Sequence, residues 1–511
     1  MYKILNRLFL FFIFFIPHLL LSQILPKEGG KLNYRLIGFS FPADKQPGNY
    51  KIEIAEGSYT AKESFERHII KTVACTTNKK IIEVPSFGKE YTWRVVHNSS
   101  SPGMNNSLHH FSTLIFSPLD TNSVRLKVLK EAEKFKDAYV FFDDNSALYD
   151  MAGSPVWFLD TKGLAPMQMV RDLKLSPAGT ITFLQGDKAY EINYSGEILW
   201  KGPDNGIVSG DGTEHYHHQL DRLKNGHYMV LGNEPALCML SGSTDTGMHI
   251  LYYSKAKWES DSTAYKKISM GTVIEYDQKG KVVWYWKSSK YFIGPYIDDY
   301  KSLDRDNQYY IDTHENSFFF DAAGKVVYVS FRNADRIIKV KYPEGNVLDA
   351  YGEKYKPGEP FENNRLFCGQ HSCLHSQDGS LLLYNNNSCQ PGSIPSIIAI
   401  DESIGGKEGL KKIWEYRCTT EDSSGSAQMK YSWPNGGNIM ELPDSSIFAC
   451  MGGIYSKLFI VSKDKKVLWS ALPVKWSETE KKWLPNSGYR ASIITSHKAL
   501  ESLIWGKRIK E

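Results

Sequence analysis

Short runs in which apolar and polar residues alternate occupy most of the chain, and turn residues separate them. Residues 189–200 and 273–284 are two clear copies of one pattern: an apolar strand, a turn that contains glycine, and a second strand that ends at tryptophan. Weaker copies occupy residues 338–347, 398–414 and 458–469. Alternation with a period of two predicts β-strands, and two strands around a tight turn predict a hairpin.

A second type of hairpin lies between the copies of the first, with turns such as residues 224–226. Two hairpins per repeat, at a spacing of about 40 to 90 residues, are typical of the four-stranded blades of a β-propeller. We expect an all-β fold with a six-bladed propeller over residues 120–511, although five or seven blades stay open. Its last blade combines residues 489–494 with a strand near residues 156–159.

The region before the propeller predicts a separate small domain. Residues 24–118 contain strand-like runs divided by Pro-, Gly- and Asn-rich turns, which is typical of a β-sandwich. Residues 91–96 and 111–114 resemble the last strands of a fibronectin type III domain. We therefore expect an N-terminal β-sandwich with a structural role.

The first 22 residues have the pattern of an export signal. Lys3 and Arg7 precede an apolar run over residues 8–21, and Pro17 would break a membrane-spanning helix there. We expect cleavage near Ser22, a periplasmic or secreted protein, and no membrane span after signal removal. An exported chain can oxidise some of its seven cysteines. Pairings of Cys368 with Cys373 and of Cys389 with Cys418 are options that the spacing leaves open.

Composition and charge exclude several functions. Hydrophobic residues make up 41% of the chain and charged residues 23%, as in ordinary globular proteins. The 61 Lys and Arg exceed the 57 Asp and Glu by only 4, so a nucleic-acid surface is not expected. The phosphate-binding glycine loops and the Gly-x-Ser-x-Gly turn of serine hydrolases are not found in the sequence.

Histidines recur at one position of the second hairpin type. Counted back from the turn, His218, His314 and His371 occupy this position in three repeats, and Gly437 occupies it in a fourth. Equivalent positions of successive blades surround the central axis of a propeller. We therefore expect the three imidazoles to point into one small volume. One buried histidine is usually structural, but three in register favour a functional site.

Further polar residues are expected near these histidines. Arg332 ends the strand that returns from the His314 hairpin, where its side chain can reach the channel. Asn316 follows His314 by two residues and is expected on the same side of that strand. His217 and His218 are adjacent, so which of them faces the channel is open, although the turn register favours His218.

Together these segments resemble the bacterial arylsulfate sulfotransferases. The resemblance is carried by residues 217–231, 314–316, 330–332 and 370–371, in this order and spacing, and it extends over about residues 30–500. The family consists of exported six-bladed propellers with an N-terminal β-sandwich. The resemblance therefore implies the same architecture and leaves a homodimer as a possible assembly.

The resemblance also implies an activity: transfer of a sulfuryl group from an aryl sulfate donor to a phenolic acceptor, without 3′-phosphoadenosine-phosphosulfate (PAPS) or another cofactor. His371 matches the family nucleophile, which carries the group as a sulfohistidine. The expected supporting residues are His218, His314 and Arg332 as catalytic groups, and Asn316 and His217 as substrate-binding groups.

Physical chemistry agrees with this assignment. A sulfuryl group carries its charge on peripheral oxygens, so positioning and charge stabilisation do most of the work, and a guanidinium can hold two oxygens at once. A neutral imidazole is a competent nucleophile, and neighbouring imidazoles can exchange a proton with the phenol. This scheme predicts ping-pong kinetics and needs no metal ion.

Two other interpretations stay open. Three histidines on one axis suit a zinc or iron site, although Arg332 in the same volume would repel the cation. The chain can also be a non-catalytic exported propeller that binds a ligand or a partner on one face.

Overall fold

The computed structural model describes residues 24–43, 49–97, 107–115, 124–160, 168–239, 250–251, 265–292, 301–303, 309–352, 366–388, 394–402, 410–418, 435–453 and 456–506. The predicted signal segment, residues 1–22, lies outside them. The chain divides into two compact units, residues 1–32 with 36–113 and residues 33–35 with 114–511. Within the described ranges, no helix has the length and hydropathy that a membrane crossing requires.

The N-terminal unit contains two β-sheets. Its described elements are β1 (Gly30–Leu32), β2 (Leu36–Ser40), β3 (Tyr50–Glu56), α1 (Lys62–Arg67), β4 (Ile69–Cys75), β5 (Lys79–Glu83), β6 (Glu90–His97) and β7 (His109–Thr113). One sheet has the strand order β1-β7-β6-β3-β4, and β2 pairs with β5 in the other. Phe39 of β2 packs edge-on against Trp93 and Phe111 of the larger sheet, with ring centroids 5.0 and 6.1 Å away. The two sheets thus share an aromatic core, and the fibronectin-like sandwich stays a prediction.

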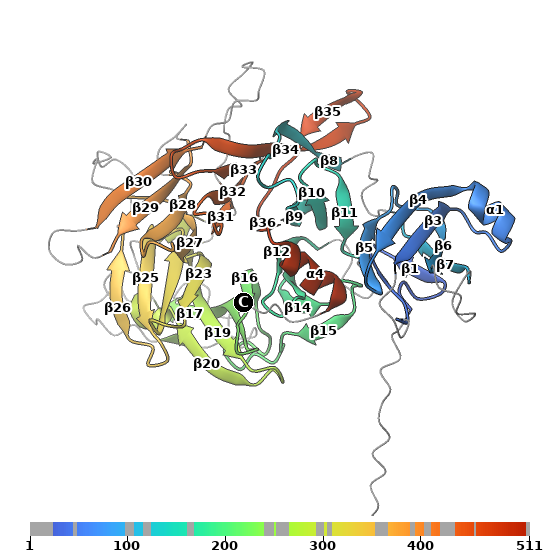
Figure 1. Cartoon of the computed structure of the whole chain (residues 1–511). Helices are drawn as coiled ribbons and strands as arrows, with labels where there is room; N and C mark the ends of the chain where they lie inside the picture. The colour runs from blue at the N-terminus through green and yellow to red at the C-terminus, as the bar shows by residue number, and fades with distance from the viewer. Residues whose placement is uncertain are drawn as a thin grey trace, which may run out of the picture. The chain divides into compact units, whose positions relative to one another are not determined.

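In the described part of the second unit there are six sheets, and each is built on four antiparallel strands (Figure 1). The first sheet contains β9 (Tyr139–Phe142), β10 (Ala147–Asp150), β11 (Pro155–Phe158) and β36 (Ala491–Ile494), and the second contains β12 (Val170–Leu175), β13 (Ile181–Gln185), β14 (Lys188–Ile192) and β15 (Ile198–Lys201). The third is built on β16 (Tyr216–Arg222), β17 (Tyr228–Met239), β19 (Tyr265–Tyr276) and β20 (Val282–Lys287), and the fourth on β23 (Glu315–Asp321), β24 (Val326–Phe331), β25 (Arg336–Lys341) and β26 (Val347–Tyr351). The fifth contains β27 (His371–His375), β28 (Leu381–Asn385), β29 (Ser396–Asp401) and β30 (Lys411–Arg417), and the sixth is built on β31 (Asn438–Glu441), β32 (Ile447–Met451), β33 (Lys457–Val461) and β34 (Val467–Ser477).

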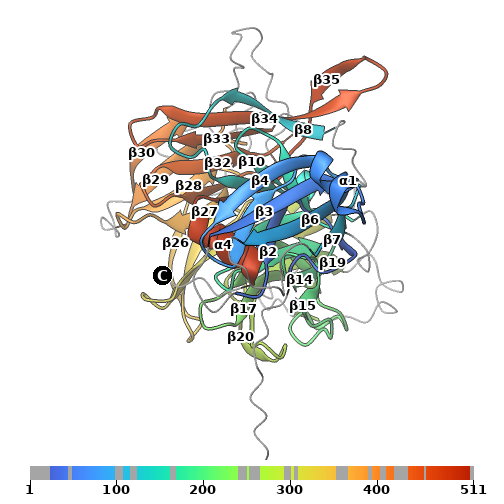
Figure 2. The same ribbon diagram turned by 45° about the vertical axis from the view of Figure 1, so that its right-hand side comes forward.

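The innermost strands of these sheets contact one another in a closed ring. Strand β36 contacts β12, β12 contacts β16, β16 contacts β23, β23 contacts β27, β27 contacts β31, and β31 contacts β36 again. Figure 1 and Figure 2 show the sheets arranged around the centre of this ring. This arrangement is a six-bladed β-propeller and confirms the fold class predicted from the hairpin repeats.

The first blade joins the two ends of the propeller. Strand β36 comes from the C-terminal end and pairs antiparallel with β9, so that Ala491 lies opposite Phe142 and Ile494 opposite Tyr139. The remaining strands of that sheet, β10 and β11, follow β9 directly. The predicted combination of residues 489–494 with a strand near residues 156–159 is therefore present.

The apolar core lies between neighbouring blades. One cluster combines Met229, Val273 and Trp286 of the third blade with Phe318 and Val329 of the fourth, and all five are buried. Comparable clusters fill the spaces between the second and third, the fourth and fifth, and the fifth and sixth blades. Each blade thus buries both faces, which explains the apolar runs in the predicted strands.

Short additional elements extend the blades. They are β8 (Val124–Lys130) and β35 (Lys482–Pro485) beside β34, β18 (Ile250–Leu251), β21 (Lys301–Leu303) and β22 (Tyr309–Asp312) in the third sheet, the 3-10 helix η1 (Asp143–Asn145), and the helices α3 (Ser289–Phe292) and α4 (His497–Trp505). Helix α4 begins at Ser496, whose hydroxyl accepts a hydrogen bond from the Ala499 N–H, and ends at Gly506 in a left-handed conformation.

Candidate active site

The first residues of three neighbouring innermost strands carry the predicted histidines. His218 lies in β16, His371 opens β27, and His314 directly precedes β23. Each of these strands has a register shift against its partner strand close to the histidine. Such irregularities interrupt the alternation of side chains and turn residues out of the plane of the sheet. The bulges thus allow side chains at the strand starts to face the centre of the ring.

Three residues with an uncommon backbone conformation lie at the same place. His218 and His314 adopt left-handed conformations with φ of +61° and +52°, and Ser372, beside His371, has φ of +62°. This region is uncommon for residues other than glycine, and it persists only where the surrounding structure enforces it. Strain at one end of three neighbouring strands points to a functional site.

The rings lie close together. The His218 and His314 ring centroids are 5.1 Å apart, nearly perpendicular to each other. Tyr489 directly precedes Arg490 and the closing strand β36. Its ring centroid lies 5.9 Å from that of His218 and 6.3 Å from that of His371. Three blades and the closing segment therefore contribute to one cluster. We call His218, His314, His371, Arg332 and Tyr489 the histidine site.

His371 is completely buried. Its Nδ1 lies 3.3 Å from the Gly369 carbonyl oxygen and 2.6 Å from Nδ2 of Asn386. Its Nε2 is also buried and makes no hydrogen bond to any part of the chain that the structure describes. The Gly369 carbonyl oxygen favours a proton on Nδ1, whereas the Asn386 amide is a donor and favours a lone pair there. In the tautomer with the proton on Nδ1, the lone pair on Nε2 is available.

Burial and neighbouring positive charge keep two of the imidazoles neutral. Burial, followed by the charge of Arg332, holds the pKa of His371 well below its usual value. Burial, followed by His217 and His314, does the same to the pKa of His218. Both rings are therefore uncharged near neutral pH, which a nucleophile requires.

Arg332 lies at the end of β24, beside His314. Its backbone N–H donates to the His314 carbonyl oxygen at 2.9 Å, and its Nη1 donates to Oδ1 of Asn333 at 3.3 Å. His314 in turn has Nδ1 3.2 Å from Oδ2 of Asp312. After burial, the charge of Arg332 is the largest influence that lowers the pKa of His371.

The two adjacent histidines have different surroundings. His218 is the one beside His314 and Tyr489. The Nε2 of His217 lies 2.7 Å from Oε1 of the buried Glu315, and its Nδ1 lies 2.7 Å from Nδ1 of His218. His217, predicted to bind substrate, therefore contacts another histidine and a carboxylate.

The predicted alignment of His314 is wrong by two positions. His218 and His371 precede Leu223 and Ser376, which open their hairpin turns, by five residues (223 − 218 and 376 − 371). The turn after β23 opens at Asp321, whose Oδ1 accepts from the Ala323 and Gly324 N–H groups, seven residues beyond His314 (321 − 314). A longer loop in this hairpin misled the count, and the structure still brings His314 to the site through its bulged start.

Asn316 occupies the position equivalent to the other histidines. It is fully buried, and its Nδ2 donates to the Gln370 carbonyl oxygen at 2.6 Å, directly before His371. The expected side-by-side placement with His314 rested on strict alternation, which the bulge between Glu315 and Ser317 breaks. The contact seen for Asn316 holds the peptide of the neighbouring blade.

Sequence reasoning missed Arg490. This buried side chain donates from Nη1 to the His218 carbonyl oxygen at 2.8 Å and from Nη2 to the Asn316 carbonyl oxygen, and its Nη1 lies 3.3 Å from Oδ1 of Asp172. It thereby ties together the second, third and fourth blades from the closing segment. No motif marks it, because its partners are backbone carbonyls in distant blades.

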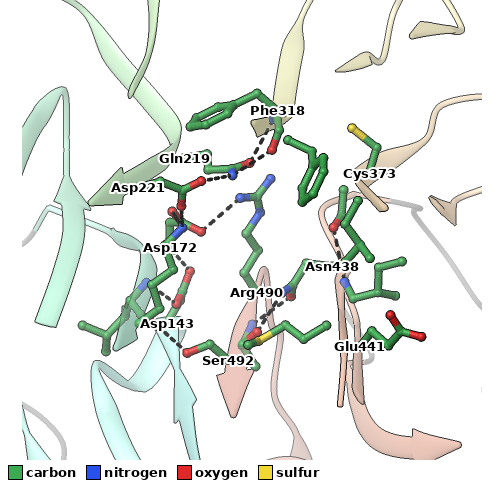
Figure 3. A pocket seen from close by; sticks show the side chains of 18 of the residues that line it. Asp143, Asp172, Gln219, Asp221, Phe318, Cys373, Asn438, Glu441, Arg490 and Ser492 are labelled. Carbon is green, nitrogen blue, oxygen red and sulfur yellow. Dashed lines mark hydrogen bonds and ion pairs between the residues drawn. The ribbon is translucent and has the colours of Figure 1, made fainter. Parts of the chain in front are cut away.

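A cavity of about 390 Å³ lies further along the same innermost strands. Figure 3 shows the Arg490 side chain extending between Asp172 and Asp221 on one side and Asn438 on the other. The lining of this cavity includes Gln219, Phe318, Cys373 and Glu441. It includes none of His218, His314, His371 and Arg332. The cavity is therefore separate from the histidine site.

Both cysteine pairings considered from the sequence are wrong, because Cys373 and Cys418 are free thiols. The Sγ of Cys373 lies 3.8 Å from Oγ of Ser317, towards the neighbouring blade. Cys368 is disulfide-bonded. Within the described part of the chain, no group of three or more His, Cys, Asp or Glu side chains is arranged to hold a metal ion.

Comparison with solved structures gives distant likenesses. A protein of unknown function from Bacteroides caccae shares 12% identity, with 68% of this chain and 93% of that chain covered and a TM-score of 0.37. An auxiliary nutrient binding protein from Bacteroides ovatus shares 10% identity, with 92% and 90% covered and a TM-score of 0.31. These likenesses are too low to transfer a function.

No curated protein matches the chain. A family model does match it, over residues 241–403, and its description is arylsulfotransferase (ASST). The matched segment contains His314, Asn316, Arg332 and His371. The match over these residues confirms the resemblance to the arylsulfotransferases that the motifs indicated.

Proposed function

We propose that the protein transfers a sulfuryl group from an aryl sulfate to a phenol through a sulfohistidine at His371. The family match supports aryl sulfotransferase activity in general. The observation that carries the finer proposal is the Nε2 of His371: it is buried, makes no hydrogen bond to the described residues, and belongs to a ring kept neutral beside Arg332. A lone pair held in this way suits attack on an electrophilic sulfur.

In the first half-reaction, His371 Nε2 forms a bond to sulfur while the bond from sulfur to the aryl oxygen breaks. The electron pair of that bond stays on the phenolate oxygen, which a neighbouring imidazole protonates. The guanidinium of Arg332 is the group suited to hold the sulfuryl oxygens, because its planar fork matches two of them and its charge offsets theirs.

In the second half-reaction, a phenol acceptor gives its proton to the same imidazole and its oxygen takes the sulfuryl group from His371. The reaction needs no PAPS, because the ester itself supplies the activated group. The Tyr489 ring between His218 and His371 offers an aromatic surface for the phenol of either half-reaction. A ping-pong scheme follows.

The decisive experiment mixes the full chain with excess 4-nitrophenyl sulfate in the absence of acceptor. Wild-type protein is expected to release one equivalent of nitrophenol per chain in a burst, and added phenol should restore continuous turnover. The His371→Ala variant is expected to lose the burst, since the nucleophile is gone, with a drop in turnover on the order of a thousandfold or more.

The matched control is His375→Ala on the same strand. Its imidazole lies 2.7 Å from Glu402, outside the histidine site. This variant should keep its burst, and thermal melting of both variants separates loss of fold from loss of chemistry. Unchanged turnover in His371→Ala, or no burst in the wild type, would favour a ligand-binding propeller instead.

A further inference from the structure

A chain of three ionisable groups, half-buried at the two histidines and buried at the carboxylate, leads away from the histidine site. Oε1 of Glu315 lies 2.7 Å from Nε2 of His217, and Nδ1 of His217 lies 2.7 Å from Nδ1 of His218. Glu315 is 1% exposed, and it comes from the fourth blade while both histidines come from the third. The chain therefore crosses a blade boundary and ends at a ring of the site.

The backbone of the third blade is shaped to receive this carboxylate. A Cβ atom built on Gly271 of β19 would lie 2.1 Å from the carboxyl carbon of Glu315. Gly271 does not have a left-handed φ, so glycine is required there for space alone. A carboxylate seated against bare backbone is held in one position, next to His217.

The hydrogen-bonding roles follow from the distances. Two Nδ1 atoms 2.7 Å apart need one proton between them. Burial works against charge on His217, but Glu315 outweighs it and, with Asp312, raises the pKa of His217, whereas the pKa of His218 is lowered. The proton between the rings therefore belongs to His217, which leaves His218 Nδ1 as acceptor and places the proton of His218 on Nε2.

We propose that Glu315 and His217 form a positioning pair that makes His218 the proton donor to the leaving phenolate and stores a proton between the two half-reactions. This inference rests on the proposed function. His314 differs from His218 in the partner of its Nδ1 atom. Nδ1 of His314 lies 3.2 Å from Oδ2 of Asp312, whereas Nδ1 of His218 lies against the His217 ring. The two imidazoles beside His371 thus have different roles.

The proton transfers balance. As the bond from sulfur to the aryl oxygen breaks, the Nε2 proton of His218 moves to the phenolate oxygen, and the Nδ1 proton of His217 moves to His218 Nδ1. His217 is then neutral and keeps its Nε2 proton towards Glu315. The acceptor phenol reverses both transfers in the second half-reaction, so that the enzyme returns to its starting state without a cofactor.

The first test needs no substrate. In the full chain labelled with 15N-histidine, and with the His217→Gln variant for assignment, His217 should be protonated on both nitrogens at about pH 7.5, above the usual range for histidine. His218 should carry its proton on Nε2. The Glu315→Gln variant should lose the doubly protonated signal. A singly protonated His217 in the wild type, or no change in the variant, would overturn the proposal.

Other charged or titratable groups also lie near His217 and His218. Asp312 and His218 face His217 besides Glu315. His314, His371 and Arg490 face His218. None of these groups changes in Glu315→Gln, so loss of the signal reports the carboxylate.

The second test measures burst rates with two donors. A poor leaving group depends on the proton donor more than a good one does, so Glu315→Gln should slow the burst with phenyl sulfate about tenfold more than with 4-nitrophenyl sulfate. Glu402→Gln, which removes the carboxylate of the equally close His375 pair outside the site, should leave the ratio unchanged. Equal slowing of both donors would indicate a merely structural carboxylate and overturn the inference.

The two tests distinguish failure of the inference from failure of the proposed function. If the wild type gives no burst with either donor, sulfuryl transfer itself is refuted, whatever the histidine protonation. If the wild type gives a burst but Glu315→Gln keeps both the signal and the ratio, only the positioning pair is refuted.

Discussion

The protonation of single side chains decides what the histidine site can do. Three imidazoles near one guanidinium repel extra positive charge, and burial removes the water that would otherwise stabilise it. Burial and neighbouring positive charge lower the pKa values of His371 and His218, whereas at His217 burial is outweighed by the buried Glu315 carboxylate, which raises the pKa. In the proposed mechanism the same residue type therefore serves as nucleophile, proton donor and proton store over a short distance.

The lowered pKa of His371 predicts the pH dependence of the first half-reaction. The nucleophile must be neutral, and the lowered pKa of His371 keeps it neutral as the pH falls through about 6.5, the usual value for histidine. We expect the burst rate to stay level from about pH 8 to below pH 6 and to fall only in more acidic solution. Stopped-flow measurement of nitrophenol release over this range checks it, and an acid limb centred at or above the usual value would contradict it.

Among the elements, close approach between neighbouring strands explains two glycines. In the sixth blade, a Cβ on Gly437 would lie 2.2 Å from the Tyr384 ring, so the position equivalent to His218 and His371 has no room for a side chain there. At Gly271 the occupant is the Glu315 carboxylate. Glycine at these positions reflects space taken by the adjacent blade.

A substitution tests the second of these contacts. Gly271→Ala should destabilise the protein by about 1 to 3 kcal/mol, because the new methyl group collides with Glu315. In the Glu315→Ala background the same change should cost much less, since the carboxylate is gone. Urea unfolding of the two single variants and the double variant measures this coupling, and additive losses would show that the two side chains do not compete for space.

Across the propeller, closure of the ring and assembly of the site depend on one segment. Strand β36 completes the first blade by pairing with β9. Tyr489 and Arg490 precede it, and Arg490 binds carbonyl oxygens of His218 and Asn316. A chain without this segment in place has neither a closed ring nor fixed positions for two of its site strands.

Disrupting β36 should therefore affect both the closure of the ring and the assembly of the site. Ser492→Pro removes a backbone N–H of β36 that faces β9, since the Asp143 N–H donates to the Arg490 carbonyl two residues earlier in the same pairing. It should lower the free energy of unfolding by about 3 kcal/mol or more, with a loss of burst activity. Lys482→Pro makes the same change in β35, which pairs only with the end of β34, and should cost less and leave the burst intact. Calorimetry and burst assays compare the two, and equal effects would argue against a special role for the closure.

The hairpin repeats were sufficient to predict the blades, because alternation with a period of two and tight turns are local properties of the chain. His218, His314 and His371 could be found in the same way, since equivalent positions in repeats meet at the axis. The error at His314 shows the limit of counting: loop length in one hairpin shifted the alignment, and bulges removed the alternation expected for Asn316.

Contacts between segments that are far apart in the sequence could not be predicted from these local patterns. The amino-acid sequence already predicted the β-propeller and the recurrent histidines, because both follow from patterns repeated at short range. Only the folded chain decided that Glu315 backs His217, that Arg490 joins three blades, and that Cys373 stays a free thiol. These depend on side chains meeting across blade boundaries, where the spacing along the chain carries no information about distance in space.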